Sequence, residues 1–226
     1  TSELQAARGV YDRLMVRDAD GRVVPELAER LTSASNHSVW TIALRPDVVF
    51  ADGTPLDALT VAINLEAQMR APANRGLLDP IASVTVASSS VVTVTMYSPW
   101  STFPEVLATR VGTIASVTTL NGGAPVGTGP FSFGRVDEDG TVVLVHNQSY
   151  WRRGLPRLDE VRLVPIPDPN ERIDAVLAGR VQMVAVDEPR QLSRLDGIPD
   201  RDARIVLHED RNAERPMVNI AFEKGR

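Results

Sequence analysis

Hydrophobic residues at the start of the chain recur at helical spacing and then give way to a polar stretch. Leu4, Ala7, Tyr11 and Leu14 fall on one face of a helix, with polar residues between them. This spacing predicts an amphipathic helix that packs on its apolar face. Residues 17–22 are mostly polar and include a glycine, which predicts a turn after the helix.

Strand spacing then replaces helical spacing. Trp40, Ile42 and Leu44 alternate with Thr41 and Ala43, so the two sets of side chains would lie on opposite faces of a strand. One set is strongly apolar and the other is not. The alternation therefore predicts a half-buried strand.

Further strands are predicted beside two turns and near the C-terminal end. A serine turn at 88–90 and an acidic turn at 137–140 each separate two alternating apolar segments, which predicts two hairpins. Three more strands are predicted at 181–186, 203–207 and 217–222. Strands that alternate with helices predict a mixed α/β fold.

Two helix starts carry capping signals. Thr54 suits an N-cap and is followed by a proline, which predicts a helix over about 55–70. Asp168 stands before Pro169 in the same way, with Glu171 as the acid of a capping box. This second helix is expected to close at Gly179, because glycine adopts the left-handed conformation of a helix end.

Composition narrows the class of protein. The chain has 226 residues, a hydrophobic content of 43% and a formal net charge of -5, which is typical of a soluble globular protein with one or two domains. Acidic residues outnumber basic ones, so the charge balance speaks against nucleic-acid binding. No apolar run reaches the roughly 20 residues of a membrane span. Cysteine is absent, which excludes disulfides and thiolate sites without identifying the compartment.

The glycine phrase at 127–130 invites a nucleotide-binding interpretation, because glycine loops let backbone amides approach phosphate. A dinucleotide fingerprint needs a third glycine where this chain has Ser132, and a P-loop needs a Gly-Lys pair that is not present. The alternative is a turn in which Gly127 and Gly129 take conformations closed to other residues. Pro130 then makes the exit from the turn rigid.

The residue patterns indicate no catalytic residue, no metal ligand and no bound cofactor. The histidines at 37, 146 and 208 are far apart in the sequence and match no zinc spacing. There is no G-x-S-x-G phrase, although a triad assembled from distant residues stays open. The acidic residues 137–139 are expected to form a solvated turn. Trp40 and Trp151 are expected to pack in the core or at a corner.

Five phrases occur in a fixed order along the chain: YDRL from Tyr11, PELAERL from Pro25, WTIALRPDVVFADGTPL from Trp40, PVGTGPF from Pro125 and NQSYWRRGLPRLDEV from Asn147. The phrase PIPDPNERIDAVLAGRVQM follows from Pro165. Together they resemble the peptide/nickel family of extracytoplasmic solute-binding proteins of ABC transporters, that is, the family 5 proteins that bind oligopeptides and dipeptides. The resemblance covers about residues 11–222 and corresponds to the N-terminal lobe only.

The resemblance implies a fold and a division into domains. We expect a mixed-sheet α/β lobe of a two-lobed, type II periplasmic-binding-protein-like fold with an inserted α+β subdomain. Residues 1–22 and 118–226 would form the sheet domain of lobe I, and residues 23–117 the inserted subdomain. The second ligand-binding lobe is expected to be absent from this chain, as is a first strand before the opening helix.

The resemblance also implies a function without catalysis. The expected role is the substrate-binding component of an ABC importer, which captures peptides or a similar small polar solute and delivers them to the permease. Such proteins are periplasmic or lie on the cell surface, attached to the outer side of the cytoplasmic membrane by a lipoprotein anchor outside this chain. A monomer is expected. The alternatives are an interaction or sensing module on the same scaffold and, with less support, a hydrolase.

The resemblance supplies candidate ligand-binding residues, at Trp100, Arg110, Gly127, Thr128, Asp187 and Glu188. An indole can stack on a ligand, a guanidinium can grip a carboxylate, and a carboxylate can bind a peptide ammonium group. Each has a plainer alternative, such as a surface arginine at 110 or helix-start acids at 187 and 188. We expect Trp100, Arg110 and Asp187 to line one concave face near the turn 127–130.

Overall fold

The computed structural model describes residues 2–186, 204–210 and 217–223. Two compact units divide the chain: Thr1–Asp18 with Arg22–Val164, and Ala19–Gly21 with Pro165–Arg226. Each unit has its own sheet and at least one helix packed on it. The mixed α/β fold class predicted from the sequence is confirmed.

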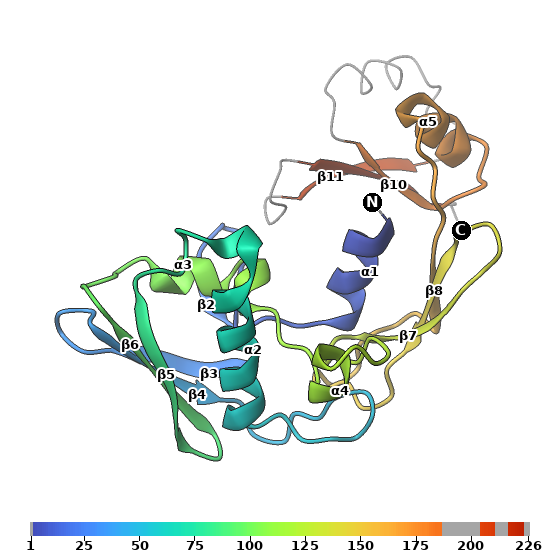
Figure 1. Cartoon of the computed structure of the whole chain (residues 1–226). Helices are drawn as coiled ribbons and strands as arrows, with labels where there is room; N and C mark the ends of the chain where they lie inside the picture. The colour runs from blue at the N-terminus through green and yellow to red at the C-terminus, as the bar shows by residue number, and fades with distance from the viewer. Residues whose placement is uncertain (1, 187–203, 211–216, 224–226) are drawn as a thin grey trace. The chain divides into compact units, whose positions relative to one another are not determined.

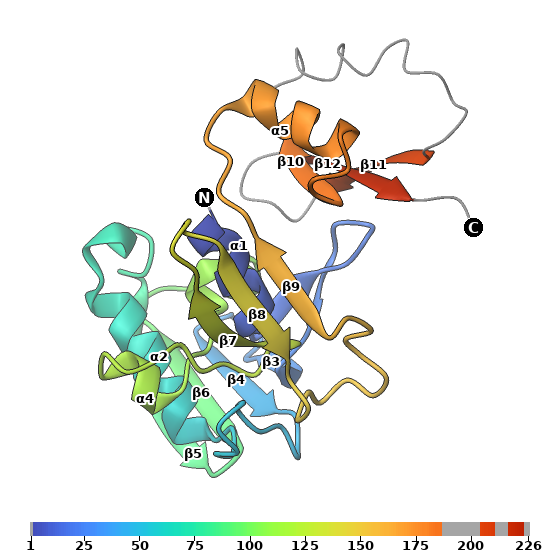
Figure 2. The ribbon, with the colours of Figure 1, turned by 90° about the vertical axis from the view of Figure 1, so that its right-hand side faces the viewer.

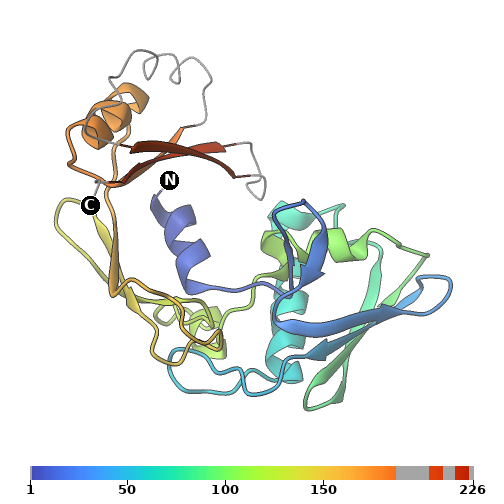
Figure 3. The ribbon, with the colours of Figure 1, turned by 180° about the vertical axis from the view of Figure 1, so that it is seen from behind.

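An antiparallel four-stranded sheet with the order β3-β4-β6-β5 forms one part of the first unit. Its strands are β3 (Ala28–Ser33), β4 (Val39–Leu44), β5 (Ile81–Ser88) and β6 (Val91–Met96). Buried residues alternate with partly exposed ones along β4 and β6, which confirms the predicted strand and the hairpin at the serine turn. Helix α2 (Ala58–Arg70) packs against β5 and β6, and Figures 1 and 3 show it in cyan beside the blue and green strands.

Helix α2 begins later than the sequence predicts. Its N-cap is Asp57, whose side chain accepts a hydrogen bond from the backbone N–H of Thr60 at 2.8 Å. The predicted cap, Thr54, instead donates its hydroxyl to Asp52 at 2.6 Å. The reason is tertiary: the backbone N–H of Leu56 bonds to the carbonyl of Val48, which holds the chain extended up to the cap.

A second sheet in the same unit has three antiparallel strands in the order β7-β8-β9. These are β7 (Phe131–Val136), β8 (Val142–His146) and β9 (Glu160–Leu163), and the first two form the hairpin predicted at the acidic turn. Helix α1 (Ser2–Val10) packs against all of these strands, as Figures 1 and 2 show. Val10 and Leu144, both almost fully buried, belong to the core between helix and sheet.

The opening helix is confirmed, but it ends at Val10 and does not reach Leu14. After Tyr11 the chain becomes extended and pairs with residues 112–114. The N–H of Leu14 bonds to the carbonyl of Gly112, and the N–H of Ile114 bonds to the carbonyl of Asp12. Backbone groups paired in this way cannot also close a helical turn, so Leu14 enters the core from an extended segment.

The first unit also contains a two-stranded sheet and several short helices. The predicted polar turn joins β1 (Met15–Arg17) to β2 (Val23–Pro25) in a small hairpin. The remaining elements are short helices: η1 (Pro72–Asn74), α3 (Phe103–Leu107), η2 (Arg110–Gly112) and α4 (Val117–Leu120). No described helix has both the length and the apolar character that a membrane span requires.

The second unit contains helix α5 (Pro169–Leu177) and a three-stranded antiparallel sheet. The sheet has the order β10-β12-β11, formed by β10 (Met183–Val186), β11 (Arg204–Asp210) and β12 (Met217–Glu223). Asp168 caps the helix as predicted, by accepting a bond from the N–H of Asn170 at 2.8 Å. Gly179 follows with a φ of 69°, which confirms the predicted helix end.

The predicted division at residues 22–23 and 117–118 stays a prediction. Strand β4 pairs with β3 and β6, while β10 and β11 both pair with β12. Segment 39–44 and segments 183–186 and 217–223 therefore belong to different sheets, as an inserted subdomain requires.

Candidate functional site

Trp100 lies in an aromatic cluster just before α3. Its ring centroid is 5.4 Å from that of Phe103, and its indole N–H donates to the hydroxyl of Thr102 at 3.0 Å. Its carbonyl accepts the indole N–H of Trp40 at 3.2 Å. Trp40 is buried in the core, as predicted, and Trp100 is only partly exposed. The orientation of the Trp100 indole is thus set by its contacts with Phe103 and Thr102.

Arg110 is exposed and lies at the start of η2. Its guanidinium donates to the carbonyl of Ala73 at 3.1 Å and to the side-chain oxygen of Asn74 at 3.0 Å. These bonds connect η2 to η1. Both acceptors are neutral oxygens, so these two bonds do not neutralise the positive charge of Arg110.

The turn 127–130 packs against the end of helix α1. A side chain at Gly127 would place its Cβ 2.1 Å from the carbonyl oxygen of Val10, so only glycine fits there. The N–H of Gly129 donates to the same carbonyl at 2.9 Å. Thr128 is fully buried, and its hydroxyl donates to Oδ2 of Asp12 at 3.2 Å. A ligand could therefore reach the side chain of Thr128 only after a rearrangement of the turn.

The described ligand-binding candidates make no hydrogen bond or ring contact with one another. The partners of Trp100, Arg110 and Thr128 lie in an aromatic cluster, in η1 and beside α1, respectively. Asp187 and Glu188 lie outside the described residues. The predicted convergence of these residues on one concave face stays a prediction.

A group of buried and partly buried residues lies at and beside the turn, and only Thr128 and Trp151 among them were singled out from the sequence. We call it the buried junction; its members are Asp12, Glu26, Thr128, Trp151 and Arg152. Asp12 and Glu26 are only 6% and 9% exposed. Oδ2 of Asp12 accepts the indole N–H of Trp151 at 2.8 Å in addition to the Thr128 hydroxyl.

Glu26 is held through both of its carboxylate oxygens. Oε2 accepts the backbone N–H of Arg13 at 3.0 Å, and Oε1 accepts the guanidinium of Arg152 at 2.6 Å. Arg152 also lies over the ring of Trp151, 4.7 Å from its centroid, and Arg45 lies at the same distance from that ring. Trp151 is thus a packed corner residue, as predicted, and it contacts cations as well as Asp12.

The electrostatics of the junction favour proton uptake by Asp12. The pKa of Asp12 is raised to about 7, mainly by burial and also by the negative charge of Glu26, while Trp151, Thr128 and Arg152 oppose the shift. Burial also raises the pKa of Glu26, against the bond from the Arg13 N–H and the charge of Arg152. The pKa of Tyr150 is raised mainly by burial and also by Asp12.

Hydrogen bonds also connect the turn 127–130 to the segment that follows β8 and to the loop that follows β4. The side-chain amide of Asn147 donates to the carbonyl of Gly129 at 2.8 Å, and the N–H of Asn147 donates to the carbonyl of Pro130. The N–H of Ala51 donates to the carbonyl of Gly127. The sequence did hold a signal for this site, because Asp12, Glu26 and Trp151 lie in three of the phrases that carry the family resemblance.

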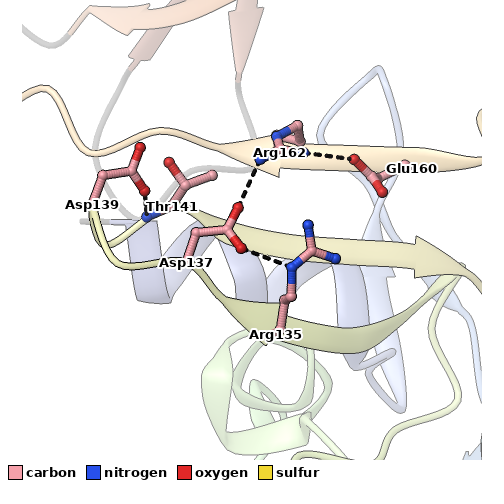
Figure 4. Close-up of polar contacts among 6 residues, drawn as sticks. All are labelled: Arg135, Asp137, Asp139, Thr141, Glu160 and Arg162. Carbon is pink, nitrogen blue, oxygen red and sulfur yellow. Dashed lines mark hydrogen bonds and ion pairs between the residues drawn. The ribbon is translucent and has the colours of Figure 1, made fainter.

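The acidic turn after β7 is a surface network, not a catalytic carboxylate pair (Figure 4). The carboxylate of Asp137 contacts Arg135 and Arg162, each at 2.7 Å. Asp139 accepts the N–H of Thr141 at 2.9 Å, and this bond lowers its pKa. Within the described residues, no group of histidines and carboxylates is arranged to hold a metal ion.

Comparison with known proteins identifies the family. Residues 22–222 match the family described as bacterial extracellular solute-binding proteins, family 5 Middle. The glutathione-binding protein GsiB of Salmonella paratyphi A is 32% identical over 186 residues, which cover 78% of this chain and 36% of that protein. The chain therefore spans little more than a third of the length of that relative.

Solved structures agree on the fold. The protein AgaA from Agrobacterium tumefaciens, in complex with agropinic acid, superposes with a TM-score of 0.82 at 24% identity, over 92% of this chain and 44% of that one. A nickel ABC transporter protein from Bacillus halodurans gives 0.78 at 27% identity, over 92% and 43%. The chain belongs to the family 5 bacterial extracellular solute-binding proteins, and its mixed α/β fold fits the N-terminal lobe of a type II periplasmic binding protein.

Proposed function

We propose that this chain is part of the substrate-binding component of an ABC importer and that it contributes one wall of the ligand site. The observation that carries the proposal is the family match over residues 22–222, which the fold of the first unit supports. Relatives in this family are transport binding proteins, and the structure gives no reason to propose a hydrolase. A sensing or interaction role on the same scaffold has no specific observation in its favour.

The proposed ligand is a small peptide or a similar polar solute. The relative from Salmonella paratyphi A is named for glutathione, which is itself a small peptide. The structure from Bacillus halodurans is named for nickel, so we test a metal complex as the second ligand class. Because the chain covers 36% of the glutathione-binding relative, contacts made by the rest of such a protein would decide between these ligands.

The proposed mechanism is closure of two lobes on the ligand. In a hinged receptor the ligand stabilises the closed form because it contacts both walls only in that form. Trp100 and Arg110 are our side-chain candidates on this wall, because neither is fully buried. Gly127 and Thr128 would act by shaping the turn, and Asp187 and Glu188 stay candidates outside the described residues.

The proposed setting is outside the cytoplasmic membrane. Members of the family are extracytoplasmic, and we extend that location to this protein. Delivery to a permease, attachment through a lipid anchor outside the chain and a monomeric state complete the proposal.

Isothermal titration calorimetry with glutathione, and separately with a nickel–histidine complex, tests the proposal. The protein is compared in two forms, as the 226-residue chain and as a longer protein that includes the second lobe its relatives possess. The longer form should bind at least one of the two ligands. The 226-residue chain should bind it about 30-fold or more weakly, because loss of buried charged contacts costs roughly 2 to 5 kcal/mol.

Variants of the longer form test whether Arg110 belongs to the wall of the ligand site. Arg110→Ala should weaken binding about tenfold or more, whereas Arg70→Ala, which removes another exposed arginine, should leave it unchanged. Equal dissociation constants for the short and long forms would contradict the proposed division of the site. Failure of the longer form to bind either ligand would contradict the proposed ligand class.

A further inference from the structure

We propose that the buried junction is a proton-controlled latch, in which protonation of Asp12 holds helix α1, the turn 127–130 and the corner 147–152 together more tightly than its ionised form does. This inference concerns the first unit alone and does not rest on the proposed function. It stands on the placement of one nearly buried carboxyl group among neutral donors and beside a second carboxylate.

The hydrogen bonds of Asp12 are compatible with a neutral carboxylic acid. The indole N–H of Trp151 and the hydroxyl of Thr128 both donate a hydrogen bond to the same oxygen, Oδ2 of Asp12. A proton on Oδ1 would leave both bonds in place, because a protonated carboxyl keeps its acceptor capacity on the other oxygen. Protonation therefore removes a buried charge without breaking the contacts that join the three segments.

Glu26 is the poorer candidate for the proton. Its two oxygens are engaged by the backbone N–H of Arg13 and by the guanidinium of Arg152, and a charge-assisted bond of this kind stabilises the ionised form. The ionised Glu26 in turn disfavours a second negative charge on Asp12. The two carboxyl groups therefore differ in their affinity for a proton, and Asp12 is the one expected to take it up first.

All charged and titratable groups that face the junction act on this balance. They come from the end of α1, the segment before β3, the residue after β4 and the corner: Tyr11, Arg13, Glu26, Arg45, Tyr150 and Arg152. Arg152 favours the ionised form of Asp12, and Arg13, Arg45 and Arg152 favour the ionised form of Glu26. At Asp12, burial and Glu26 oppose ionisation, and burial is the largest influence.

The direction of the pH effect follows from where the charge of Asp12 is better hydrated. An ionised Asp12 gains hydration when the junction opens, so ionisation favours the open form and protonation favours the closed form. The backbone bonds that opening would break are those from Ile114 to Asp12 and from Gly129 to Val10. The latch should therefore loosen as the pH rises through neutrality and tighten as the pH falls.

The test is the NMR signal of the Trp151 indole N–H in the 226-residue chain, followed from pH 5 to pH 9. The chain has three tryptophans, so single Trp→Phe variants assign the signal. We expect a titration with a midpoint near neutral pH in the wild type and none in Asp12→Asn, because asparagine keeps an acceptor for the indole but cannot titrate. Asp159→Asn, at an exposed carboxylate, is the matched control and should titrate like the wild type.

Two further measurements complete the test. Glu26→Gln should move the midpoint to lower pH, since the repelling charge is removed. The amide protons of Gly129 and Ile114, after correction for the intrinsic effect of pH on exchange, should lose about tenfold of their protection between pH 6 and pH 8.5 in the wild type. They should keep that protection in Asp12→Asn.

Several results would overturn the proposal. One is an indole signal that is constant from pH 5 to pH 9 in the wild type, and another is a titration that persists in Asp12→Asn. If Asp12→Asn does not fold, the carboxyl carbon of Asp12 in ¹³C-aspartate-labelled wild type gives the midpoint directly. A midpoint below pH 5 in that measurement would equally overturn the latch.

Discussion

At the residue scale, the turn 127–130 depends on the absence of side chains. Gly127 and Gly129 both lie so close to Val10 that a Cβ would meet its carbonyl oxygen, at 2.1 Å and 2.6 Å. The close approach lets Thr128 reach Asp12. The glycines therefore serve the packing of this turn against helix α1. Neither Gly127 nor Gly129 has a positive φ, so the prediction that they take conformations closed to other residues is wrong, and the lack of space beside Val10 is what requires glycine.

We predict that Gly127→Ala lowers the free energy of unfolding by about 3 kcal/mol, because the rigid carbonyl of Val10 must move. Gly9→Ala is the control, since the tight contact of its new Cβ would be with the end of the flexible Leu144 side chain and not with backbone, and alanine favours the helix. Its effect should stay within about 1 kcal/mol. Urea denaturation of both variants measures this, and equal losses of stability would contradict the close-packed turn.

Arg152 is predicted to matter more than a surface arginine. Arg152→Met should lower the free energy of unfolding by about 2 kcal/mol, because Glu26 is only 11% exposed at its side chain and loses its charged partner. Arg70→Met removes an exposed ion pair with Glu66 and should lower the free energy of unfolding by only about 0.3 kcal/mol. Chemical denaturation at pH 7 compares the two, and an equally small effect at Arg152 would show that the junction is not held by this pair.

At the element scale, helix boundaries follow tertiary contacts. Helix α1 stops at Val10 because the next residues pair with segment 112–114. Helix α2 starts at Ala58 because the chain before it is bonded to Val48. The alternation of apolar residues, by contrast, located β4 and β6 correctly, since each of these strands buries one face. The hairpin of β7 and β8 was also located correctly, although β8 buries three consecutive residues and β7 buries none.

The cap of α2 can be tested directly. We expect Asp57→Ala to lower the free energy of unfolding by about 1 kcal/mol, since the N–H of Thr60 loses its partner. Thr54→Ala removes only an exposed contact with Asp52 and should change stability by less than about 0.5 kcal/mol. Thermal unfolding followed by circular dichroism compares the two; a larger loss at Thr54 would restore the cap predicted from the sequence.

At the scale of the whole molecule, the junction joins segments of the first unit that lie next to different helices and strands. Asp12 follows α1, Glu26 precedes β3, and Trp151 follows β8. Residues far apart in the sequence thus share one buried cluster of charges and donors. A change in charge at this cluster is expected to affect the stability of the unit as a whole.

We predict that the global stability falls as the pH rises from about 5 to about 8. The pKa of Asp12 is raised to about 7 in the folded protein, from 3.8, so the folded state binds a proton that the unfolded state has released. The stabilisation is complete below the unfolded value and is lost as the pH passes through the folded value. It amounts to about 4 kcal/mol at most.

Urea denaturation of the wild type and of Asp12→Asn at a series of pH values measures this effect. The difference in unfolding free energy between the two proteins should change with pH in favour of the variant above pH 7. A difference that is independent of pH would show that Asp12 does not take up the proton.

The sequence by itself determined the fold class, most strands, the second helix cap and the family, because these depend on local periodicity and on phrases in a fixed order. It also identified Trp151 as a corner residue. Such features need only the neighbouring residues or the order of segments along the chain, and both are visible in a single sequence.

Only the tertiary structure decided where α1 ends, which residue caps α2 and what Thr128 does. Each depends on a partner distant in the sequence: Thr128 meets Asp12 from 116 residues away, and Trp151 meets it from 139. The raised pKa of Asp12 arises from burial among such partners. No local pattern distinguishes this aspartate from a solvated one, because the energy of its charge is set by the atoms that surround it after folding.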